Sequence, residues 1–247
     1  MPYDLFHRSR AQDDALDAVI RCASSAGTDG VVALDLDGCL FDNRHRQVRI
    51  ARVWADQSDD VRLSKLSIDD FQDWSFLNTL AGLGIDPAEA NRIFEAFQPF
   101  WVQAFFSDDY VCHDLPAPGA SRFARDVAAT GARVTYLTGR GHAQRPSTLD
   151  NLRRYGFPID DEGVALMTKP SEQMGDAEWK RMGFAALSLE SQVVGFVDNE
   201  PIHVRYAAET FPDAAVVWTQ TDHSPGAEPP GESVLRIRGF LRTSNEV

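Results

Sequence analysis

Residues 31–42 of the chain read VVALDLDGCLFD. The apolar run 31–34 is typical of a fully buried strand, and Gly38 allows the chain to turn sharply after it. Asp35 and Asp37 follow this strand, at the end where open α/β sheets bind their ligands. The stretch therefore predicts a buried strand that carries acidic side chains to a functional site.

Asp35 and Asp37 lie two residues apart, so in extended backbone both side chains project to the same side of the chain. Two ionised carboxylates about 4 Å apart repel each other by about 4 kcal/mol at an effective dielectric constant of about 20. Such a pair needs a shared proton or a divalent cation. A D-x-D-G string also occurs in ordinary turns, where an aspartate only caps the strand, so the residues alone leave both alternatives open.

Composition limits the classes of protein that the chain can represent. Its 247 residues, 43% of them hydrophobic, suffice for one large α/β domain with an inserted subdomain. The formal net charge of -13 argues against general binding to nucleic acid or to an anionic membrane. The three cysteines form no CxxC pair, and no signal peptide or membrane-length apolar run is found. We therefore expect a cytoplasmic protein with reduced thiols and without nucleic-acid or membrane partners.

Helices and strands are expected to alternate along most of the chain, an order typical of a mostly parallel sheet with helices on both faces. Residues 43–115 interrupt this order with helices only. The predicted fold class is therefore α/β: a Rossmann-like, doubly wound parallel sheet formed by residues 1–42 and 116–247, with an all-helical cap inserted at 43–115. The expected helices are 13–26, 67–84, 86–106, 121–130, 147–155, 176–187 and 202–209, and the expected strands are 31–34, 133–137, 164–167, 193–197, 214–218 and 234–237.

Polar residues also follow two later strands, Thr138 in YLTGR and Asp198 in FVDNEP. Because parallel strands place their carboxyl ends at one edge of a sheet, these residues can converge with the first two aspartates. In order and spacing, DLDGCLFD, YLTGR, a lysine and FVDNEP together resemble the four motifs of the haloacid dehalogenase superfamily, most closely its phosphatases. The resemblance covers residues 31–42 and 115–218, and it implies Mg²⁺-dependent hydrolysis of phosphate esters on a Rossmann-like fold.

The resemblance implies a role for each acidic position. Asp35 would attack phosphorus and form an aspartyl-phosphate, and Asp37 would protonate the leaving oxygen and then activate water. Asp198 would hold Mg²⁺ together with the carboxylate of Asp35 and the backbone carbonyl of Asp37. Mg²⁺ prefers such oxygen ligands, and its charge would also relieve the repulsion between the carboxylates.

The second and third motifs would bind the phosphoryl group. Thr138 would donate a hydrogen bond to it, and Gly139 and Arg140 are further candidate phosphate-binding residues of the same motif. The motif lysine would neutralise the phosphoryl charge and orient the nucleophile. Lys180 matches the family spacing because it lies in the helix before the fourth motif, and Lys169 is the alternative.

The residues after the fourth-motif aspartate depart from the family pattern, and the arginines after the first motif are not part of it. Many relatives carry a second acid near the fourth motif, where this chain has Asn199 and Glu200. Glu200 either acts as that acid or caps the helix opened by Pro201. Arg44 and Arg46 follow the first motif directly, so they are candidate clamps for an anionic part of the substrate; the alternative is a solvated basic face.

Asp37 favours a phosphate ester over an organic halide as the substrate, because dehalogenases typically lack an acid at this position. The sequence therefore predicts a Mg²⁺-dependent phosphohydrolase whose cap encloses a small phosphorylated metabolite. A phosphomutase needs the same acid and stays an alternative. A dehalogenase and a catalytically silent small-molecule-binding protein on the same fold are the others.

Overall fold

The computed structural model describes residues 4–243 except Asp59 and Gln72. Its main sheet has six strands in the order β5-β4-β1-β6-β7-β8, and all neighbours in it pair in parallel. The chain first builds one side of β1 and then returns to build the other, so the fold is a doubly wound, Rossmann-like α/β sheet, as predicted. The strands are β1 Gly30–Leu34, β4 Arg133–Gly141, β5 Val164–Lys169, β6 Gln192–Asp198, β7 Ala215–Thr219 and β8 Leu235–Ile237.

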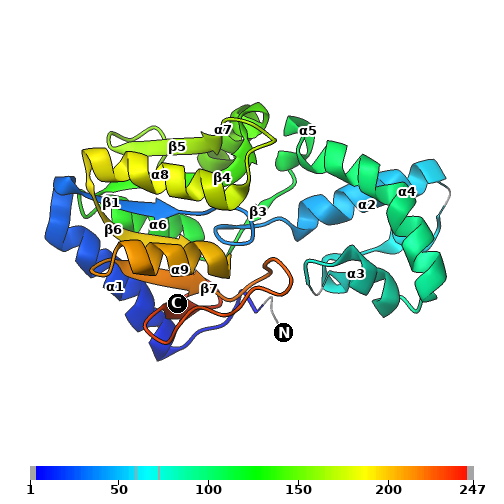
Figure 1. Cartoon of the computed structure of the whole chain (residues 1–247), viewed down its shortest axis with the longest axis horizontal. Coiled ribbons are helices and arrows are strands. Elements are labelled where there is room, and N and C mark those ends of the chain that lie inside the picture. Colours follow the sequence, from blue (N-terminus) through cyan, green and yellow to red (C-terminus); the bar gives the residue numbers. More distant parts are fainter. Residues whose placement is uncertain (1–3, 59, 72, 244–247) are drawn as a thin grey trace.

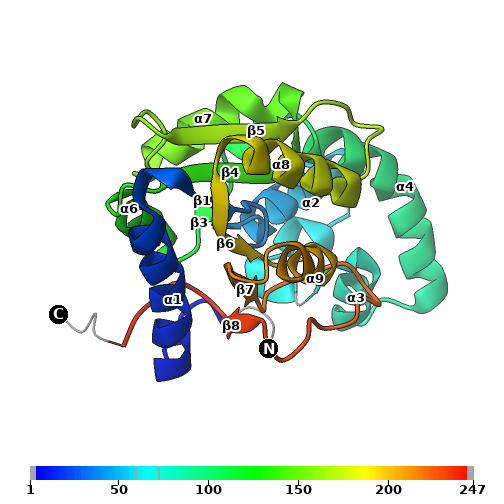
Figure 2. The same ribbon diagram turned by 60° about the vertical axis from the view of Figure 1, so that its left-hand side comes forward.

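Helices cover both faces of this sheet (Figure 2). One face packs against α1 (Arg10–Ala26), α6 (Ala120–Ala128) and α7 (Arg145–Arg154), and the other against α8 (Asp176–Glu190) and α9 (Pro201–Thr210). The buried side chains of α1 recur at helical spacing, which is why the sequence pattern identified it. Its stripe facing the sheet comprises Leu16, Val19 and Ala23, all fully buried.

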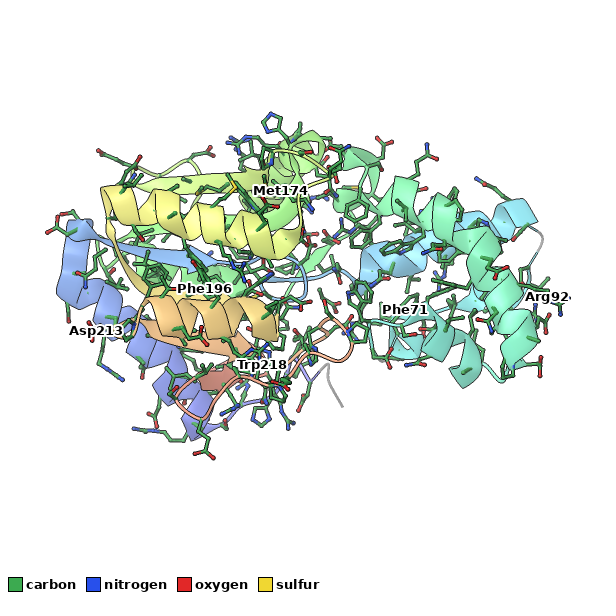
Figure 3. The ribbon with its side chains drawn as sticks, viewed as in Figure 1. Phe71, Arg92, Met174, Phe196, Asp213 and Trp218 are labelled. Atoms are coloured by element: carbon green, nitrogen blue, oxygen red, sulfur yellow. The ribbon has the colours of Figure 1, made fainter. Side chains whose placement is uncertain are left out.

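The helical insertion, residues 43–115, leaves and rejoins the sheet through a short antiparallel pair, β2 (Phe41–Asp42) and β3 (Leu115–Pro116). Its helices lie beyond the end of the sheet (Figure 1) and enclose an apolar cluster separate from the two clusters of the core. Phe71 lies in the insertion, and Phe196 and Trp218 lie in the core (Figure 3). The helices of the insertion are α2 Arg44–Ser58, α3 Phe76–Gly82, α4 Pro87–Phe105 and α5 Asp108–Val111.

The helix expected at 86–106 is present as α4. The Asp86 side chain accepts hydrogen bonds from the first-turn amides of Ala88 and Glu89 at 3.0 and 3.4 Å, and Pro87 occupies the first helical position. Both features favour a helix start at this point.

One expectation for the insertion was wrong. The helix expected at 67–84 divides into a 3-10 turn at Ile68–Asp70 and helix α3, because Ser67 and Asp70 close a capping box around one turn and Ser75 caps a new helix. The segment 44–58, for which no helix bounds were predicted, is helix α2.

No helix in the ranges 4–58, 60–71 and 73–243 is long and apolar enough to cross a membrane.

Candidate active site

The carboxyl ends of β1, β4 and β6 bring the predicted site residues to one edge of the sheet. Asp35 follows β1, and its amide donates to the Val197 carbonyl of β6 at 2.9 Å. Thr138 lies in β4 and Asp198 ends β6. All three polar side chains are almost completely buried, with 6% of Asp35 exposed and none of Thr138 or Asp198. Parallel pairing of neighbouring strands thus joins segments that are more than 150 residues apart in the sequence.

Lys180 lies between two of these carboxylates. Its Nζ donates to Asp35 Oδ1 at 2.6 Å, to Asp198 Oδ2 at 2.8 Å and to the Leu137 carbonyl at 2.6 Å. Burial opposes its charge, but the attraction of Asp198 and Asp35 is larger and raises the pKa of Lys180 above its ordinary value. Lys169 instead donates to Asp176 at 2.6 Å. Of the two candidate lysines, the structure therefore places Lys180 at the carboxylates.

The two carboxylates that share Lys180 differ in their environment. Burial raises the pKa of Asp35 to about 7, although Lys180 opposes the shift. For Asp198 burial acts in the same direction, but Lys180 and His203 outweigh it and lower the pKa below its usual range. The second partner explains the difference, because His203 Nδ1 lies 3.2 Å from Asp198 Oδ2. Asp35 is thus the carboxylate whose negative charge is least compensated.

This donor set fits a magnesium ion. Two buried carboxylates share a single ammonium group, and carboxylate oxygens are ligands that Mg²⁺ prefers. Within the described residues, no three His, Cys, Asp or Glu side chains are arranged as a metal site. The resemblance assigns the third protein ligand to the backbone carbonyl of Asp37.

The Asp37 side chain is held by two arginines. Arg46 Nη2 donates to Oδ1 at 2.5 Å, and Arg140 donates to Oδ2 through Nε and to Oδ1 through Nη2, both at 2.9 Å. The same arginines contact Asp114, which lies directly before β3, at 3.1 and 2.8 Å. Asp37, Arg46, Asp114 and Arg140 together form what we call the arginine–aspartate cluster. It joins the end of β1 to both connections of the helical insertion.

The charges of the arginine–aspartate cluster determine its protonation. Burial opposes ionisation of Asp37, but Arg140 and Arg46 outweigh it and hold the pKa of Asp37 well below its usual range. Asp114 is fully buried, and burial raises its pKa to about 6 despite the same two arginines. Asp37 is therefore ionised near neutral pH, and Asp114 is the member that takes up a proton first.

The structure corrects the interpretation of the basic residues after the first motif. Arg46 is fully buried, and 8% of Arg44 is exposed. Arg44 donates through Nε and Nη2 to the two carboxylate oxygens of Asp42, at 2.9 and 2.7 Å. A solvated basic face is therefore wrong for both arginines. A single sequence gives little sign of this, because charged side chains are rarely buried unless they are paired.

The remaining motif residues have specific contacts. The Thr138 hydroxyl accepts from the Arg140 amide at 3.2 Å. Glu200 occupies the N-cap position of α9, but its side chain makes no capping hydrogen bond; its carboxylate instead accepts from the Ser224 amide and hydroxyl at 3.0 and 3.2 Å. Asn199 donates its side-chain amide to the Asp222 carbonyl.

Sequence reasoning missed two residues, Asp114 and His203. His203 lies in the first turn of the helix that follows Asp198, and this short spacing in the sequence is a signal for a contact with the fourth motif. Asp114 has no comparable signal because its two partners come from other segments of the chain.

A cavity of about 580 Å³ separates this edge of the sheet from the helical insertion. Its floor includes Asp35, Asp37, Lys180 and Asp198, and Gly139 and Arg140 also line it, whereas Arg44 and Arg46 do not. The opposite wall is formed by side chains of the insertion. The cavity therefore brings the predicted nucleophile, the lysine and a large enclosed volume together.

No family model and no curated protein matches the chain. Solved structures similar to it include the class C acid phosphatase of Bacillus anthracis with tungstate bound, which is 18% identical with a TM-score of 0.44, covering 86% of this chain and 70% of the other. Protein tyrosine kinase A of Mycobacterium tuberculosis is 17% identical with a TM-score of 0.49, covering 85% and 93%. A haloacid dehalogenase-like family hydrolase of Streptococcus pneumoniae is 9% identical with a TM-score of 0.43, covering 75% and 81%.

The placement of the motif residues in this chain is evidence that does not depend on these low identities and TM-scores. A doubly wound sheet carries Asp35 and Asp37 after its central strand, Thr138 on one neighbouring strand and Asp198 on the other, with Lys180 between two of the carboxylates. In fold and in the placement of its four motifs, the chain resembles the haloacid dehalogenase superfamily.

Proposed function

We propose that the chain is a Mg²⁺-dependent phosphohydrolase that cleaves phosphate monoesters of small molecules through an aspartyl-phosphate on Asp35. The observation that best supports the proposal is the placement of Lys180, with Nζ 2.6 Å from Asp35 and 2.8 Å from Asp198 on the floor of the cavity. An acidic nucleophile beside a fixed positive charge suits attack on an anionic phosphoryl group.

In the first step, a carboxylate oxygen of Asp35 attacks phosphorus while the bond between phosphorus and the ester oxygen breaks. Asp37, which enters this step protonated, donates its proton to the leaving oxygen, and Asp35 then carries the phosphoryl group. Lys180 stays protonated, orients Asp35 and neutralises charge on the phosphoryl oxygens, and the Thr138 hydroxyl donates to one of them. Mg²⁺, when held by Asp35, Asp198 and the carbonyl of Asp37, supplies further positive charge at these oxygens.

In the second step, water attacks phosphorus, the acyl phosphate bond breaks, and inorganic phosphate leaves Asp35. Asp37 accepts the proton of this water, a role open to it because the arginines keep its carboxylate ionised near neutral pH. The protonated Asp37 then supplies the next leaving oxygen. Because Arg46 belongs to the insertion, movement of the insertion away from the core would weaken one of the two contacts and favour protonated Asp37.

We also propose that the insertion acts as a cap over the cavity, which would exclude bulk water from the reaction. A small phosphorylated metabolite is the proposed partner, and the net charge of -13 argues against nucleic acid. The cytoplasm is the proposed location, consistent with the three free cysteines.

The test is the release of inorganic phosphate from a panel of phosphate monoesters, measured with Mg²⁺ and again with EDTA. The proposal predicts metal-dependent turnover that Asp35→Asn lowers by orders of magnitude, because an amide is a far poorer nucleophile. Asp160→Asn is the matched control, since this carboxylate pairs with an arginine on the surface.

Turnover that persists in Asp35→Asn, or that is unchanged when EDTA removes the metal, contradicts the mechanism. Transfer of phosphate between hydroxyl groups without net release would instead indicate a phosphomutase. Halide release from a 2-haloacid offered in parallel would indicate a dehalogenase, and the absence of any product from either kind of substrate would favour the silent binder.

A further inference from the structure

The cavity has two walls of different chemistry. The core contributes the carboxylates, Lys180 and polar side chains of the sheet edge. The insertion contributes mainly aromatic side chains, and within the described residues it adds no charged side chain to the lining. A volume of about 580 Å³ lies in the range of pockets that hold whole small molecules, so it leaves room for an organic group beyond the phosphate. The aromatic part of the insertion's wall comprises Trp74, Phe76, Phe94, Phe97, Trp101, Phe105 and Phe106.

Most rings of this aromatic wall pack against other aromatic rings of the insertion. The ring centroids of Phe97 and Phe76 lie 4.4 Å apart, and those of Trp101 and Phe105 lie 4.7 Å apart. Phe97 also packs edge-on against Trp54 at 5.4 Å. Contacts of this kind fix the rings before any ligand enters. The wall is therefore a preformed apolar surface that faces the reaction centre.

The basic side chains of the lining already have carboxylate partners. Within the described residues, those that line the cavity are Lys180 and Arg140, which each pair with two carboxylates, and His203, which pairs with Asp198. Arg46 is fully buried and does not line the cavity. On the core side, Glu200 adds a carboxylate beyond the catalytic floor, and Asp176 is already paired with Lys169 at 2.6 Å. A carboxylate or second phosphate on the substrate would lose its hydration without gaining a partner, which is strongly unfavourable.

We propose that the substrate is the phosphate monoester of an uncharged alcohol or phenol that carries an aromatic or comparably large apolar group. The inference rests on the proposed phosphohydrolase function and adds the chemical class of the leaving group. The phosphate binds at Lys180 and the metal, and the apolar group packs on the aromatic wall. Burial of this group lowers the free energy of binding, whereas a second anion in its place raises it.

The test compares two alkyl phosphates with similar leaving oxygens, phenylethyl phosphate and phosphooxypropanoate, the second of which carries a carboxylate in place of the ring. The expected kcat/KM is higher for phenylethyl phosphate by about tenfold or more, because the ring is buried and the carboxylate is not matched. An equal or lower value for phenylethyl phosphate overturns the inference while the phosphohydrolase function stands. Absence of phosphate release from both esters and from p-nitrophenyl phosphate overturns the function itself.

Variants of the wall decide whether the rings cause the preference. Trp101→Ala should lower kcat/KM for phenylethyl phosphate by roughly tenfold, mainly through KM, and should leave that for phosphooxypropanoate near the wild-type value. Phe100→Ala is the matched control, since Phe100 lies on the same helix and packs in the same apolar cluster but does not line the cavity. Trp74→Ala tests the wall without disturbing the cluster, because 55% of Trp74 is exposed.

An equal loss for both esters in the Trp101 and Trp74 variants overturns the assignment of the wall, as does the same change of preference in Phe100→Ala. A loss confined to phenylethyl phosphate in at least one wall variant, with the control unchanged, supports it.

Discussion

Replacement of Arg46 by methionine should destabilise the protein in a way that depends on pH. Arg46 is fully buried and contacts Asp37 Oδ1 at 2.5 Å, Asp114 Oδ1 at 3.1 Å and the Phe105 carbonyl at 3.1 Å. Its guanidinium also lies 4.0 Å from the centre of the Phe105 ring. Methionine keeps most of the apolar volume but removes the charge and the donors, so the arginine–aspartate cluster is left with one arginine for two carboxylates.

The cluster can respond to the loss of Arg46 in two ways, and the response with the lower free energy sets the size of the effect. An uncompensated charge in the cluster would cost about 3–5 kcal/mol. Protonation of Asp114 avoids this cost, and because its pKa is about 6, it requires only about 1.4 kcal/mol at pH 7. The lost hydrogen bonds to Asp37 and Phe105 add about 1 kcal/mol each. We therefore expect the free energy of unfolding to fall by about 3 kcal/mol at pH 7.

The pH dependence has a definite sign. In the folded wild-type protein Asp114 is half protonated near pH 6 and mostly ionised from pH 7 upward, so the slope that it adds fades over this range. In the variant its folded-state pKa lies higher still, so the folded state binds one more proton than the unfolded state. Stability contributed by such a group is lost as pH rises, at about 1.4 kcal/mol per pH unit. The difference between wild type and variant should therefore widen from pH 6 to pH 8.

Urea unfolding at pH 6, 7 and 8 measures this difference. Arg153→Met is the matched control, because Arg153 pairs with Asp160 at 2.8 Å on the surface, and it should show little loss and no dependence on pH. A loss in Arg46→Met that matches the control, or that stays constant from pH 6 to pH 8, would refute the account of Arg46 as a buried counter-ion.

Further variants test other parts of the site and fold. Lys180→Met should lower kcat by about a hundredfold or more, whereas Lys169→Met should stay near wild type; steady-state rates decide, and the reverse order contradicts the assignment. Asp37→Asn should slow dephosphorylation more than phosphorylation, which gives a burst of p-nitrophenol in rapid mixing, and the absence of a burst excludes Asp37 from the second step. Gly119→Ala should destabilise by about 1–3 kcal/mol, because Gly119 has φ +87° and a Cβ there would lie 2.5 Å from a carbonyl oxygen. Gly82→Ala has open space and is its control in thermal melts, where equal melting temperatures would contradict the argument.

The sheet was predictable because its strands carry local signals. β1 and β6 are apolar runs that end abruptly in aspartates, and every residue of β1 is buried. The order of the four motifs then indicated which strand ends meet, since a parallel sheet gathers its carboxyl ends at one edge. Lys180 was preferred over Lys169 from the same order, and the structure places it at Asp35 and Asp198.

The arginine–aspartate cluster was not predictable in the same way. Arg46 and Asp114 stand in segments that look polar and solvated, and their burial depends on β2 pairing with β3 to bring the two ends of the insertion together. This pairing joins residues that are far apart in the sequence, and no pattern in either segment predicts it. The helix boundaries within 67–84 failed for a related reason, because the capping box at Ser67 and Asp70 encloses only one turn.

The formation of the aspartyl-phosphate is the central claim, and it can be measured directly. A phosphate monoester with a radiolabelled phosphoryl group is mixed rapidly with the protein and Mg²⁺, quenched in acid, in which acyl phosphates persist, and digested for peptide mapping. We expect label on the peptide that contains Asp35, loss of that label in hydroxylamine, and no label in Asp35→Asn. Label on any other residue, or substrate turnover with no labelled protein at any time, would contradict it.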